Sequence, residues 1–116
     1  MTPTGEKFFN ALEKIIEENG IEIDRPKGSR HPNFPDFIYE VDYGYIRSTK
    51  SLDGKEIDVF VGTSDAGVVG CVCTIDLLKK DSEIKVLFNC TWEEIDLVLE
   101  MMSHDPMSCV FIARGI

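Results

Sequence analysis

The chain has 116 residues, of which 43% are apolar and 28% are charged, as in an ordinary soluble globular protein. This length suits a single domain spanning residues 1–116. The 21 acidic residues outnumber the 12 basic ones and give a net charge of −9, which argues against nucleic-acid or membrane partners, because both need a basic surface. No apolar run approaches the roughly 20 residues of a membrane span, and the first residues do not resemble a secretion signal, so we expect a cytoplasmic protein.

The first half of the chain predicts one helix followed by short extended segments. Residues 2–19 place apolar side chains at helical spacing, and Gly20 suits the end of that helix. The proline-rich stretch after Arg25 predicts a long loop. Strands or extended segments are expected at 21–25, 38–41, 43–46 and 57–62, with a turn at 49–55.

The second half predicts a hairpin, a helix and a last strand. Residues 68–75 are almost wholly apolar, residues 76–81 form a polar connection, and residues 83–88 alternate as a half-buried strand does. Thr91 and Glu94 have the spacing of a capping box, which opens a helix over 91–103. A final strand is expected at 109–113.

These elements predict a mainly β fold with one helix near each terminus. The strands follow one another through short turns rather than through helices, which favours a small OB-like antiparallel barrel over a doubly wound sheet. Its core would span residues 21–90.

Four aspartates lie at the ends of predicted strands. Asp53 and Asp58 bracket one turn, and Asp76 and Asp81 bracket the next polar connection. If these strands are neighbours, the carboxylates meet at one rim, where they repel unless a cation fills the site, and oxygen ligands favour Mg²⁺, Mn²⁺ or Ca²⁺. Aspartates are also common turn formers and solvated loop charges, so their spacing alone leaves both interpretations open.

A longer pattern resembles the signature of a known enzyme family. Tyr43-Gly44-Tyr45-Ile46, Ser51-Leu52-Asp53-Gly54 and Asp58-Val59 resemble the motif of the Mg²⁺-dependent, single-barrel soluble inorganic pyrophosphatases. Asp24-Arg25 fits the pair that precedes this motif. The segment from Arg25 to Pro32 looks like a short bacterial branch of the family, and the whole resemblance covers about residues 21–90.

The resemblance implies hydrolysis of diphosphate to two phosphates with Mg²⁺, for which Mn²⁺ is a possible substitute. By position, Asp53, Asp58 and Asp81 would be metal ligands, and Asp76 a further ligand or a catalytic base. Arg25 and Tyr43 would hold phosphate and take part in catalysis.

The chain also departs from the family pattern. Lys55 stands where the family has the aspartate that helps to activate water, and Glu83 stands where it has a lysine. Lys55 could instead face phosphate as a fixed cation, and Lys85 could replace the missing lysine only if the register slips. We therefore expect a diphosphatase, of either full or weakened activity. A pyrophosphatase-like binding module without catalysis and a hydrolase of another phosphate ester or nucleotide are the alternatives, and a homo-oligomer is possible.

Overall fold

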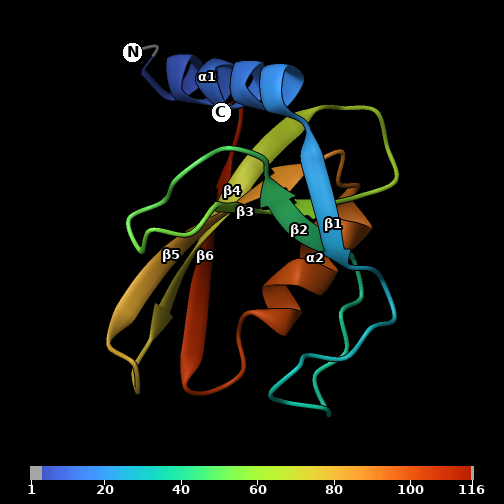
Figure 1. Cartoon of the computed structure of the whole chain (residues 1–116), viewed down its shortest axis with the longest axis vertical. Coiled ribbons are helices and arrows are strands. Elements are labelled where there is room, and N and C mark those ends of the chain that lie inside the picture. The colour runs from blue at the N-terminus through green and yellow to red at the C-terminus, as the bar shows by residue number, and fades with distance from the viewer. Residues whose placement is uncertain (1–3, 116) are drawn as a thin grey trace.

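The computed structural model describes residues 4–115, in which six strands form one sheet with two helices against it (Figure 1). The strands lie in the order β1-β2-β3-β5-β4-β6. In chain order the elements are α1 (Thr4–Asn19), β1 (Ile21–Arg25), β2 (Asp42–Ile46), β3 (Ile57–Val61), β4 (Val68–Asp76), β5 (Asp81–Phe88), α2 (Trp92–Met101) and β6 (Met107–Ala113).

The expected mainly β fold with a helix near each end is confirmed, and it is consistent with a small barrel. Four of the strand pairs are antiparallel, but β3 and β5 run parallel. This parallel pair arises because β5 folds back from β4 as a hairpin and lies between β4 and β3. It brings residues that are far apart in sequence, such as Asp58 and Lys85, to the same level of the sheet.

The two helices cover opposite faces of the sheet. One apolar cluster joins α1 to Val59 and Val86, and the other joins α2 to Phe60 and Leu87. Because neighbouring residues of a strand point to opposite faces, these pairs of consecutive residues place the clusters on the two sides. Figure 1 shows β4, β5 and β6 extending away from α1.

Most of the predicted elements are confirmed, with shifted ends. The predicted helix starts at residue 2, but residues 2 and 3 lie outside the described part of the chain. The capping box is present: the Thr91 hydroxyl accepts from the Glu94 backbone, and the Glu94 carboxylate accepts from that of Thr91. The polar connection at 76–81 is a tighter hairpin than predicted, because Asp76 and Asp81 pair across its ends.

The segment 38–41, predicted to be extended, is not part of the sheet. It closes the long loop after β1 through a single bridge between Arg30 and Ile38, and the backbone N–H of Tyr39 donates to the Ser29 carbonyl. Tyr39 is 4% exposed, so the apolar pattern of this segment reflects packing on the α2 side of the sheet rather than a strand. Among residues 4–115, no helix is both long and apolar enough to cross a membrane.

Candidate functional site

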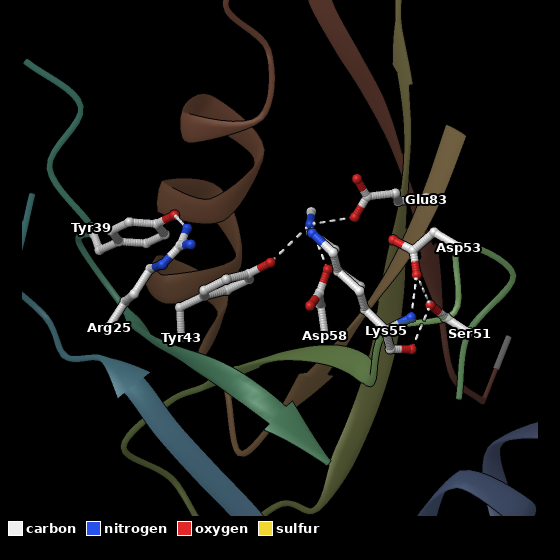
Figure 2. Close-up of polar contacts among 9 residues, drawn as sticks. Arg25, Tyr39, Tyr43, Ser51, Asp53, Lys55, Asp58 and Glu83 are labelled. Carbon is white, nitrogen blue, oxygen red and sulfur yellow. Dashed lines mark hydrogen bonds and ion pairs between the residues drawn. The ribbon is translucent and has the colours of Figure 1, made fainter. Parts of the chain in front are cut away.

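Lys85 is the centre of a polar cluster on the α2 side of the sheet. Its ammonium lies 3.0 Å from the Tyr43 hydroxyl and 3.0 Å from a carboxylate oxygen of Asp58 and of Glu83. Tyr43 comes from β2, Asp58 from β3, and Glu83 and Lys85 from β5 (Figure 2). Asp58 pairs with Lys85 in the register of β3 and β5, and Glu83 precedes Lys85 by two residues, so all three point to one face.

This cluster holds a permanent cation between two carboxylates. The Lys85 side chain is 8% exposed, whereas those of Asp58 and Glu83 are 28% and 36% exposed. Burial alone would lower the pKa of Lys85, but its contacts with Tyr43, Asp58 and Glu83 outweigh burial and raise the pKa. Burial also raises the pKa of Tyr43, so its hydroxyl stays protonated at neutral pH.

Arg25, at the end of β1, lies beside the ring of Tyr43, the tyrosine whose hydroxyl contacts Lys85 (Figure 2). One of its guanidinium nitrogens donates to the Tyr39 hydroxyl at 2.5 Å. The guanidinium carbon lies 5.5 Å from the ring centre of Tyr39 and 5.7 Å from that of Tyr43, and the two rings stack 5.2 Å apart. Two cations, Arg25 and Lys85, thus flank one tyrosine.

Gly44 explains why β1 can place Arg25 so close to Tyr43. A Cβ atom at this position would overlap the backbone carbonyl of Glu22 on β1. Only glycine lets the two strands approach in this way. The glycine between two tyrosines is therefore a requirement of packing that positions Arg25 beside Tyr43, with which it pairs.

The turn before β3 fixes the Asp53 carboxylate through one side-chain hydroxyl and one backbone N–H. The Asp53 carboxylate accepts from the Ser51 hydroxyl at 2.5 Å and from the Lys55 backbone N–H at 2.9 Å. The hydrogen bond from Ser51, with that from Lys55, lowers the pKa of Asp53. The Lys55 side chain extends from this turn toward the cluster around Asp58 (Figure 2).

Asp76 and Asp81 lie at the far end of the β4–β5 hairpin. Asp81 is four residues before Lys85, which corresponds to roughly 13 Å along a strand. One Asp76 carboxylate oxygen accepts from the backbone N–H groups of Leu78 and Lys79, both at 2.9 Å, so it stabilises the hairpin turn. The length of the hairpin is what separates this pair from Asp58.

The structure therefore does not bring the four predicted metal ligands together. Within residues 4–115, no three histidine, cysteine or acidic side chains are arranged to hold a metal ion. Of the predicted site residues, Tyr43, Asp58 and Lys85 share one cluster, with Arg25 beside it. The assignments of Asp53, Asp58, Asp76 and Asp81 as metal ligands, and of Asp76 as a base, stay predictions.

Sequence reasoning missed two members of the site. Glu83 counted only as a departure from the family pattern, and Tyr39 was assigned to an extended segment. Glu83 could have been found from its spacing of two residues from Lys85, since this spacing places both side chains on one face of a strand. Tyr39 carried no such signal, because a long loop brings it to Arg25.

Comparisons with known proteins agree with the fold. No protein-family model matches the chain, and no curated protein matches it. The solved inorganic pyrophosphatase of Helicobacter pylori is 13% identical, with a TM-score of 0.56 and 82% of each chain covered. That of Coxiella burnetii is 17% identical, with a TM-score of 0.54, and covers 80% of this chain and 81% of its own. At these identities the likeness establishes one thing: the chain has the fold of an inorganic pyrophosphatase.

Proposed function

We propose that the chain hydrolyses diphosphate to two phosphates with the help of Mg²⁺. The observation that carries the proposal is the pair of cations, Arg25 and Lys85, on either side of Tyr43. Diphosphate has two anionic groups joined by one oxygen, so it needs positive charge at two neighbouring points. Guanidinium and ammonium groups supply such charge, and a guanidinium also forms paired hydrogen bonds to phosphate oxygens.

In this proposal the chain's own residues bind and orient the anion. Arg25 contacts one phosphoryl group, and the protonated Tyr43 hydroxyl can donate to an oxygen between the two. Lys85 fixes the positions of Asp58 and Glu83 and balances their charge. Small phosphate compounds as ligands, a cytoplasmic location and self-association accompany the proposal as predictions.

The carboxylates of Asp58 and Glu83 would hold the magnesium ion. Both lie 3.0 Å from the Lys85 ammonium, so the two carboxylates are close to each other, and the ion would share them with this lysine. This donor set fits Mg²⁺, which commonly takes one or two carboxylates and completes its shell with water and substrate phosphate. When bound, the ion would supply Lewis-acid polarisation of the phosphate oxygens.

The same contacts predict slow turnover. A carboxylate that takes a proton from water would here have to act beside an ammonium, because Asp58 and Glu83 are both paired with Lys85. The carboxylate of Asp76, the predicted base, accepts a hydrogen bond from the backbone of the hairpin turn. Loss of a positioned base costs about 10²–10⁴ in rate, so we expect hydrolysis well below that of an enzyme with a free carboxylate at this point.

Phosphate release from diphosphate in the presence of Mg²⁺ tests the proposal. Asp58→Asn should abolish release by the purified protein, because the cluster loses one of its two carboxylates. Asp96→Asn removes the same charge from an exposed position of α2 and should leave release unchanged. Equal release by both variants, or none by the unchanged protein, would contradict hydrolysis at this site.

A second candidate function is binding without hydrolysis. It is favoured by the engagement of four carboxylates in contacts within the chain, since one oxygen of each is already committed to a partner, in Asp53, Asp58, Glu83 and Asp76. A binding module would gain thermal stability from a diphosphate analogue while releasing no phosphate. A screen of nucleotides and phosphate esters for phosphate release would identify the third possibility, a different substrate of the same chemical class.

A further inference from the structure

The charges around the cluster are unequally paired. Lys85 forms ion pairs with both Asp58 and Glu83, so these two carboxylates already have a cationic partner. Within residues 4–115, Arg25 and Lys55 take part in no ion pair. Two cationic side chains beside the same cluster thus lack an ion-pair partner among the described residues.

Both of these cations are held near the cluster by local structure. Arg25 is fixed by its bond to the Tyr39 hydroxyl and by its position over the Tyr43 ring. The backbone of Lys55 is fixed by the Ser51 turn, because its carbonyl accepts from the Ser51 N–H at 2.7 Å and its N–H donates to Asp53. Figure 2 shows the Lys55 side chain directed at the cluster rather than away from it.

The Asp53 carboxylate forms no ion pair with the Lys55 ammonium, although the charge of this lysine adds to the hydrogen bonds that lower the pKa of Asp53. Its hydrogen bonds come from the Ser51 hydroxyl and from the backbone of Lys55, and not from the ammonium of that lysine. The whole chain carries a net charge of −9, so it does not attract anions in general. An anion would be drawn to this cluster only by its local cations.

We propose that this site binds diphosphate-like anions directly, without a divalent cation, through Arg25 on one flank of the Lys85 cluster and Lys55 on the other. The inference rests on the proposed function for the class of ligand and goes beyond it in two ways. It assigns Lys55 as a contact of the anion, and it makes binding independent of Mg²⁺ even where hydrolysis needs the ion.

Calorimetric titration with methylenediphosphonate, a diphosphate analogue that cannot be hydrolysed, tests the inference in buffer containing EDTA. The unchanged protein should bind the analogue there, and higher salt should weaken binding because the contacts are ionic. Lys55→Gln should raise the dissociation constant by roughly tenfold to a hundredfold, the effect expected for loss of one charge-assisted contact. Lys50→Gln removes the same charge just before the turn and should change the constant less than twofold.

The outcomes separate this inference from the proposed function. Absence of binding in EDTA by a folded protein overturns the inference, and so does an equal effect of the Lys55 and Lys50 substitutions. If phosphate release with Mg²⁺ is still observed in that case, the proposed function stands without the inference. Binding in EDTA that depends on Lys55, with no phosphate release under any condition, supports the inference and contradicts hydrolysis. Thermal melting of each variant verifies that the fold is intact.

Discussion

Replacing Lys85 by methionine tests whether this residue holds the site together. Methionine fills a similar volume but leaves the carboxylates of Asp58 and Glu83 facing each other without a cation. Removing one partner of a fully buried ion pair costs about 3–5 kcal/mol. Because these carboxylates are 28% and 36% exposed, water screens part of their repulsion, and we expect a loss of about 2–3 kcal/mol in the free energy of unfolding.

Urea unfolding of Lys85→Met near pH 7.5 measures this loss. Adding Asp58→Asn should restore part of the stability, and Mg²⁺ should stabilise the single variant more than the unchanged protein. A loss no larger than that of Lys14→Met, an exposed position on α1, would refute the reasoning.

Three further predictions concern local structure. Thr91→Ala removes the capping hydroxyl of α2 and should cost about 1 kcal/mol in the free energy of unfolding, measured with urea. Gly44→Ala should cost about 3 kcal/mol or more, because a Cβ there overlaps β1, whereas Gly5→Ala, in open space on α1, should be neutral or stabilising; the reverse order would contradict the packing of β1. Ser51→Ala should raise the pKa of Asp53 in an NMR titration, and an unchanged pKa would mean that the Ser51 hydroxyl does not hold this carboxylate.

The fold could be predicted because its elements have local signals. The capping box at Thr91 marks the start of α2, and alternation along residues 83–88 marks a strand. The strand order and the parallel β3–β5 pair had no such signal, because they depend on contacts between distant segments. Tyr39 shows the same limit: its apolar neighbours predicted an extended segment, but the loop carries it to Arg25 instead.

The candidate site was predicted only in part, because some of its residues have a local sequence signal and others depend on contacts between distant segments. Tyr43, Asp58 and Arg25 belong to a motif whose spacing is set by two adjacent antiparallel pairs, so the sequence pattern places them well. The position of Lys85 depends on which residue of β5 lies beside Asp58, and spacing along the chain does not determine this register. The expected meeting of Asp76 and Asp81 with Asp58 required a shorter hairpin than the one that forms.

A crystal structure with Mg²⁺ and methylenediphosphonate tests the central claim most directly, namely that the residues around Tyr43 form the diphosphate site. The account predicts one phosphonate group in contact with Arg25 and Tyr43, the other near Lys55, and the ion bound by the carboxylates of Asp58 and Glu83. Analogue bound at another place on the sheet, away from Arg25 and Tyr43, would contradict it.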